Sequence, residues 1–172
     1  MREATLSAPG SSPSRGRPSL YRLERRQVVP VGPAEAFEFF ADAFNLEAIT
    51  PPWLHFRVDT PGPISMGTGT LIQYRLRLHG LPARWLTRIE AWEPGRRFED
   101  AQLRGPYRHW HHRHTFSRHE QGTEMCDRVD YELPFGPVGR LAHAALVARD
   151  LERIFDFRAA AVGARFRDWV LD

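Results

Sequence analysis

Five histidines lie between positions 109 and 119, within the stretch GPYRHWHHRHTFSRHE that covers residues 105–120. Imidazole side chains bind transition metals, transfer protons near neutral pH and pair with buried carboxylates. The stretch could therefore be a metal site, a catalytic centre, a pH-sensitive group, or a strand that uses imidazole for packing. Which of these it is depends on the elements that position the side chains.

Residues 107–119 alternate as a β-strand does, so neighbouring side chains point to opposite faces. One face carries Trp110, His112, His114 and Phe116. The other face carries Tyr107, His109, His111, Arg113 and Thr115, and His119 lies near a predicted turn. Because Trp110 and Phe116 are large and apolar, the first face is predicted to point inward, and the five histidines cannot converge on one ion.

The next predicted strand supplies a partner for the inward histidines. The residues of one parity in it are Met125, Asp127, Val129 and Tyr131. A buried carboxylate is costly unless it is paired, and imidazole is the nearest partner available to Asp127. If the segment SRHEQGT closes a hairpin, His112 and His114 lie opposite or diagonal to Asp127 and its neighbour on the same face.

Three interpretations of this group remain open. His112, His114 and Asp127 could supply three ligands to a metal, although no spacing signature supports a metal site. The same three residues are candidates for acid–base catalysis, in which a carboxylate orients an imidazole beside a substrate. The interpretation that we favour is a polar network that lines a pocket, to which Asp100 and Gln102 add polar groups.

The rest of the chain predicts an α+β fold. Strands are predicted at residues 21–31, 54–60, 70–80, 82–94, 96–105, 107–119 and 123–136, with a tight turn at Gly80–Pro82. Two short helices are predicted after Pro33, broken near Asp42 and stopped by Pro51 and Pro52. From Val138 onward, apolar residues recur at helical spacing, which predicts one long amphipathic helix. They are Leu141, Ala144, Ala148, Leu151, Phe155, Val162, Phe166 and Trp169. About seven antiparallel strands would curve around this helix and enclose a cavity.

Composition narrows the classes of protein. The chain of 172 residues contains no lysine, so Schiff-base chemistry and a phosphate-loop lysine are excluded. Its net charge is only +3 and its arginines are spread out, which argues against a nucleic-acid binder. A single cysteine, Cys126, fits a reducing compartment, and we expect a cytoplasmic protein with no transmembrane segment. Residues 1–19 are predicted to be a flexible tail, and residues 20–172 a single domain.

The order of elements and several motifs resemble the START/SRPBCC superfamily, also called the helix-grip or birch-pollen-allergen-like fold. The segments that carry the resemblance are VPVGPAEAFEFFADAFNLEAITPPWLHFRV, GTGTLIQYRLRLHGLP, FEDAQLRGPYRHWHHRHTF, GTEMCDRVDYELPFGPVG and LERIFDFR. Within that superfamily the chain is similar to bacterial ligand-binding proteins grouped with polyketide cyclases and dehydrases.

The resemblance implies an internal pocket for an apolar or aromatic small molecule. We expect no cofactor and no bound metal. The resemblance supplies no catalytic set, and it leaves the oligomeric state unknown. Some similar domains are fused to a nucleotide-sugar-epimerase-like domain, which implies a functional link to an epimerase-like protein. The predicted ligand-binding residues are Tyr74, Trp85, Asp100, Gln102, Trp110, His112, His114, Phe116, Asp127, Tyr131, Leu151 and Phe155.

Three functions follow. The first is a binder of a hydrophobic or aromatic, lipid-like or polyketide-like molecule, oriented by the inward polar group. The second is a cyclase, dehydratase or isomerase in which a histidine moves a proton, Asp127 holds the imidazole and Tyr131 donates to the developing oxyanion. The third is an accessory protein that acts on a partner or lipid, with Trp53 as an aromatic at the cavity mouth.

Overall fold

The computed structural model describes residues 20–142 and 146–169. The predicted tail lies outside these residues. The elements are β1 (Tyr21–Val29), α1 (Pro33–Ala41), α2 (Asn45–Ala48), the 3-10 turn η1 (Pro52–Leu54), β2 (Arg57–Val58), β3 (Leu71–Leu78), β4 (Leu81–Glu93), β5 (Arg97–Arg104), β6 (His109–His119), β7 (Gly122–Glu132), α3 (Gly136–Ala142) and α4 (Ala148–Trp169).

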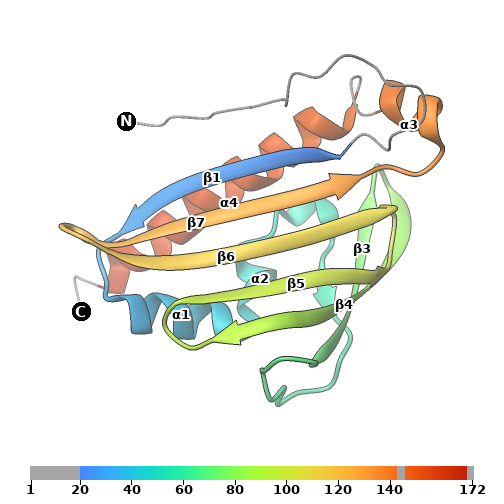
Figure 1. The fold of residues 1–172 in the computed structure, drawn as a ribbon. Helices are drawn as coiled ribbons and strands as arrows, with labels where there is room; N and C mark the ends of the chain where they lie inside the picture. The colour runs from blue at the N-terminus through green and yellow to red at the C-terminus, as the bar shows by residue number, and fades with distance from the viewer. Residues whose placement is uncertain (1–19, 143–145, 170–172) are drawn as a thin grey trace.

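The strands form one antiparallel sheet in the order β1-β7-β6-β5-β4-β3-β2. Consecutive strands from β2 to β7 are neighbours, and β1 closes the order by pairing with β7. The sheet curves, and α4 runs along its concave side, while α1 and α2 cover one end (Figure 1). This arrangement confirms the predicted helix-grip architecture.

The hairpin between β3 and β4 turns earlier than predicted. His79 and Gly80 both have positive φ, 50° and 80°, as a two-residue hairpin turn of the primed type requires. Leu81 then pairs with Leu78, so Pro82 lies inside β4 rather than in the turn. The sheet tolerates this proline because the pairing of β4 with β5 begins only at Leu86.

The predicted strand at residues 54–60 is mostly wrong. Only Arg57 and Val58 pair, as the edge strand β2 beside β3. The two prolines before this segment favour a turn. The 3-10 turn η1 has Pro52 at its first position, and His55, which caps its C-terminal end, has a φ of 45°.

The prediction of one continuous C-terminal helix falls partly outside the described residues, so it stays a prediction. The structure has two helical elements, α3 and α4, and residues 143–145 between them are outside the described part of the chain, as is Ala144 of the predicted stripe. Helix α4 has 22 residues and is about 33 Å long. The predicted inward stripe of α4 is confirmed at Leu151, Phe155, Val162 and Phe166, all of which are buried.

The space between the sheet and α4 has two halves that are packed differently. The filled half consists of the buried residues around Phe37, Phe39, Phe116, Val162 and Phe166. There the ring of Phe37 from α1 lies with its centroid 5.5 Å from that of Phe116 on β6. The cavity half is bounded by the aromatic and aliphatic residues of β3, β4, β6 and α4, and it is not closed by side chains.

Candidate functional site

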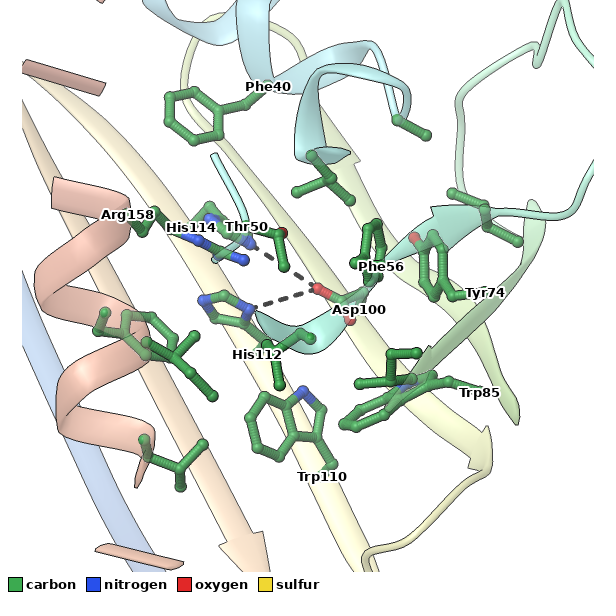
Figure 2. Close-up of a pocket in the computed structure, with 18 of the residues that line it drawn as sticks. Phe40, Thr50, Phe56, Tyr74, Trp85, Asp100, Trp110, His112, His114 and Arg158 are labelled. Carbon is green, nitrogen blue, oxygen red and sulfur yellow. Dashed lines mark ion pairs between the residues drawn. The ribbon is translucent and has the colours of Figure 1, made fainter. Parts of the chain in front are cut away.

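A cavity of about 150 Å³ lies in the cavity half, between the sheet and α4. Its walls are mainly apolar and include Ile72, Leu76, Trp85, Trp110, Leu151 and Phe155. Tyr107 also lines it. The polar lining residues labelled in Figure 2 are Thr50, Tyr74, Asp100, His112, His114 and Arg158. The polar residues come from β3, β5, β6, α4 and the segment after α2, so no single motif of the sequence contains them.

The predicted facing of β6 is confirmed. Trp110, His112, His114 and Phe116 are all buried, whereas His109 is exposed. Strands β6 and β7 pair from His109 to His119 without a register shift, so the alternation is not interrupted. Both inward histidines therefore reach the interior, and they lie close together, with ring centroids 3.8 Å apart.

Asp127 of β7 contacts both inward histidines, as predicted. It lies directly opposite His114 in the pairing of β6 and β7. Oδ1 of Asp127 is 2.6 Å from Nδ1 of His114 and 3.3 Å from Nε2 of His112. One carboxylate oxygen thus lies within ion-pair distance of one nitrogen of each imidazole, although neither nitrogen has the geometry of a hydrogen bond to a described residue.

Asp100 of β5 lies on the other side of the two rings. Its Oδ2 is 3.8 Å from Nδ1 of His112 and 3.8 Å from Nε2 of His114, the two ion pairs marked in Figure 2. The buried hydroxyl of Thr87 donates to Oδ1 of Asp100 over 3.0 Å. Three adjacent strands therefore place two imidazoles between two carboxylates.

This environment separates the proton affinities of the two histidines. Burial, followed by the positive charge of His114, lowers the pKa of His112 to about 4. Burial also opposes a charge on His114, but Asp127 and Asp100 outweigh it and raise the pKa of His114 above its ordinary value. At neutral pH, His112 is then neutral and can accept or donate a hydrogen bond, and His114 holds a proton more tightly than His112 does.

The pKa values of the two carboxyl groups, Asp127 and Asp100, are both lowered. Burial by itself would raise the pKa of Asp127 and of Asp100, but the neighbouring imidazoles outweigh it and hold both values below the ordinary range. Both groups are therefore ionised at neutral pH. The hydroxyl of Tyr74 stays protonated, because burial raises its pKa far above the ordinary value.

The group that could hold a metal differs from the trio predicted. One atom each of Asp100, His112 and His114 lies within 4.8 Å of the others, a spacing that could admit a divalent ion. Asp127 lies behind the imidazoles, where it orients them rather than completing the set. The guanidinium of Arg158 lines the same cavity and would repel a dication there.

Eight of the twelve predicted ligand-binding residues line the cavity. They are Tyr74, Trp85, Asp100, Trp110, His112, His114, Leu151 and Phe155. Their role in binding remains a prediction.

The other four predicted residues do not line the cavity. Gln102 closes the loop between β5 and β6, where its Nε2 donates to the Tyr107 carbonyl oxygen over 2.7 Å. Phe116 lies in the filled half. Asp127 lies behind the histidines, and Tyr131 packs against Trp110 with ring centroids 6.1 Å apart. Tyr74 and Tyr107, not Tyr131, are therefore the tyrosines that line the space where a ligand would lie.

Arg158 is the functional candidate that the sequence analysis missed. It lies on α4 between Phe155 and Val162, which are both buried on the inward stripe of the helix. An arginine that interrupts such a stripe would have been a usable signal, because a charged residue at a buried position needs a partner.

The fold and the cavity define a helix-grip protein with a polar group on one wall of an apolar pocket. The chain belongs to the family described as polyketide cyclase/dehydrase and lipid transport, whose model matches residues 21–167. This confirms the resemblance to the START/SRPBCC superfamily. No curated protein matches the sequence.

Solved structures with the same fold have low sequence identity. The Zhui aromatase/cyclase from Streptomyces sp. R1128 is 17% identical, with a TM-score of 0.67 over 88% of this chain and 96% of that one. The protein TTHA0849 from Thermus thermophilus is 20% identical, with a TM-score of 0.60 over 87% and 97%. Ara h 8.0201 is 14% identical, with a TM-score of 0.61 over 87% and 99%.

Among the described residues, no helix is both long enough and apolar enough to cross a bilayer.

Proposed function

We propose that this protein binds a hydrophobic or aromatic small molecule in the cavity between its sheet and α4. The observation that carries the proposal is the lining of that cavity, in which large apolar side chains surround one polar wall formed by His112, His114 and Asp100. Pockets for small organic ligands have this composition, because apolar area supplies affinity and a few polar groups fix orientation.

The size of the cavity limits the ligand. A void of about 150 Å³ with apolar walls is sufficient for a single aromatic ring, as an engineered cavity of similar volume in another protein binds benzene. A molecule of two or three rings would require side chains at the rim, such as half-buried Ile154 and Phe56, to move. The family description, which names polyketide cyclases and lipid transport, supports a ligand of this chemical kind.

A second candidate function is catalysis of a cyclisation or dehydration. It is favoured by His112, which is neutral at pH 7, lines the cavity and is held by Asp127 through its other side. Such a histidine can accept a proton from a carbon beside a carbonyl group, and the hydroxyl of Tyr74 can donate to the developing oxyanion. The name of the Zhui aromatase/cyclase, a structural neighbour, is in line with this chemistry.

Native mass spectrometry of the protein purified from its own host tests the binding function. A retained small molecule, released by denaturation and apolar or aromatic in character, would support the proposal. Protein that carries no small molecule, and that takes up no aromatic probe in titration, would contradict it.

One pair of variants separates binding from catalysis. Asp127→Asn removes the charge that orients both histidines, whereas His109→Asn changes an exposed histidine of the same strand and serves as the control. If the site only binds, Asp127→Asn weakens affinity for the retained molecule. If the site catalyses, the variant abolishes turnover and largely spares affinity. Metal content, measured on the same samples, reports whether the cluster holds an ion.

Two finer expectations remain predictions. A cytoplasmic location agrees with the single half-buried cysteine, Cys126. A functional link to an epimerase-like protein follows only from the resemblance described above.

A further inference from the structure

Arg158 is a charged group that forms no ion pair with a carboxylate among the described residues. Its guanidinium lines the cavity, and its Nε is buried without a hydrogen bond to any residue that the structure describes. It also forms no ion pair within that part of the chain. Burial lowers the pKa of Arg158, but arginine remains protonated at all physiological pH values.

The two nearby carboxylates do not satisfy this cation. Asp127 is held against His114, and Asp100 faces both histidines and accepts from Thr87. In the view of Figure 2, Arg158 reaches in from α4, whereas Asp100 approaches from β5 on the far side of the imidazole rings. Arg158 lines the cavity, so its guanidinium borders the space that a ligand would occupy.

Neighbouring groups keep the guanidinium in place and add donors. Its central carbon lies 5.2 Å from the centroid of the Phe155 ring, in a cation–π contact that favours one placement of the charge. The hydroxyls of Tyr74 and Thr50 line the same cavity, and neither forms a hydrogen bond with a described residue. A cation, two hydroxyl donors and an apolar remainder match one acidic group on an otherwise apolar molecule.

We propose that the ligand of this cavity is a carboxylic acid, bound as its carboxylate by the guanidinium fork of Arg158 with its apolar part against Trp110 and Phe155. This inference rests on the proposed binding function. Planar carboxylate matches the two parallel donors of arginine, which gives both strength and orientation. A phosphate is disfavoured, because its second negative charge would be repelled by Asp100, which also lines the cavity.

The test compares matched acids and amides on the full chain. Benzoate and 2-naphthoate are titrated by calorimetry at pH 7.5 beside benzamide and 2-naphthamide, which have nearly the same shape but no charge. We expect at least one acid to bind at least tenfold more tightly than its amide. If an amide binds as tightly as its acid, the carboxylate inference is overturned while the binding function stands. If neither acids nor amides bind, the carboxylate inference and the proposed binding function are both overturned.

Variants of α4 locate the effect. Arg158→Met should reduce the affinity for the acid at least tenfold and change the affinity for the amide less than threefold. Arg149→Met, a change at an exposed arginine of the same helix, should alter neither. The affinity of Arg158→Lys for the acid should lie between those of the unmodified protein and of Arg158→Met, since lysine keeps the charge but lacks the planar pair of donors. Equal losses for acid and amide in Arg158→Met would overturn the assignment, and the comparison in the unmodified protein decides the question if that variant does not fold.

Discussion

The filled half and the cavity half share one sheet face and one helix, yet only one of them is packed. In the filled half, Phe37 of α1 inserts between sheet and helix, with its ring centroid 5.0 Å from Trp92 and 5.9 Å from Phe98. In the cavity half, Trp110 is also surrounded by rings, 5.1 Å from Trp85 and 4.7 Å from Tyr107, but a cavity of about 150 Å³ lies beside it.

The difference shows that aromatic content does not by itself distinguish a core from a binding pocket. Strand β6 passes through both halves with one unbroken alternation, and contributes Phe116 to the filled half and His112 to the cavity. The deciding feature is α1, which lies against β6 and β7 at one end of the sheet only. Phe40 of α1 borders the cavity, whose remaining lining comes mainly from the strands and α4.

The largest effect on stability is expected when a large side chain of the filled half is truncated. Phe116→Ala should lower the free energy of unfolding by about 3–5 kcal/mol, because it empties a site enclosed on all sides. Urea denaturation measures the change. A loss below about 2 kcal/mol would mean that this half is also loosely packed, and the contrast between the halves would disappear.

Lowering the pH should destabilise the protein through a histidine of the cavity half. Because the pKa of His112 is about 4 in the folded protein and 6.5 ordinarily, the unfolded chain binds more protons between these values, and stability is lost as pH falls from about 6.5 to 4. In the unmodified protein, this contribution to the loss of stability should be roughly 2–3 kcal/mol. The variant His112→Asn should lack it.

His114 acts in the other direction, since its pKa is raised and its contribution is lost as pH rises through that raised value. Denaturation curves at several pH values, with exposed His109→Asn as the control, measure both trends. Equal acid sensitivity in the unmodified protein and His112→Asn would contradict the assignment.

Truncation at the cavity should cost less than truncation in the filled half. Phe155→Ala enlarges a void that already exists, so we expect a loss of about 1–2 kcal/mol together with altered ligand affinity. Thermal and urea unfolding, with titration of an aromatic probe, test this. A cost similar to that of Phe116→Ala, with unchanged probe binding, would place Phe155 in dense core.

The smallest stability effect is expected when the void is filled. Leu151→Phe adds volume at the cavity wall and should change stability by less than about 1 kcal/mol while it reduces ligand affinity. Val162→Phe on the same helix is the matched control in the filled half, where overpacking should cost about 1–3 kcal/mol. Equal costs for the two substitutions would show that the halves do not differ in free space.

Much of the sheet and part of the site could be predicted, because strand parity is a local property. Alternation of large apolar residues in β6 was sufficient to place His112 and His114 inside, and the hairpin to β7 brought Asp127 beside them. Strand ends were predicted less well where prolines redirect the chain, as at Pro52.

The remainder of the site depends on distances across the fold that the sequence does not encode locally. Gln102 has the parity of Asp100, but the loop that follows uses its amide, and only the three-dimensional path of that loop reveals this. Arg158 faces the cavity because α4 crosses the sheet at one angle and height, which helical spacing alone does not determine.

The distribution of tryptophans gives each half its own optical signal. Trp85 and Trp110 stand at the cavity wall with ring planes 88° apart, and Trp92 packs against the filled half, while Trp53 is 48% exposed. A protein with phenylalanine in place of Trp53 and Trp169 would emit only from these interior indoles. Its fluorescence would then respond to an occupant of the cavity through two of them and to the integrity of the packed half through the third, without an added dye.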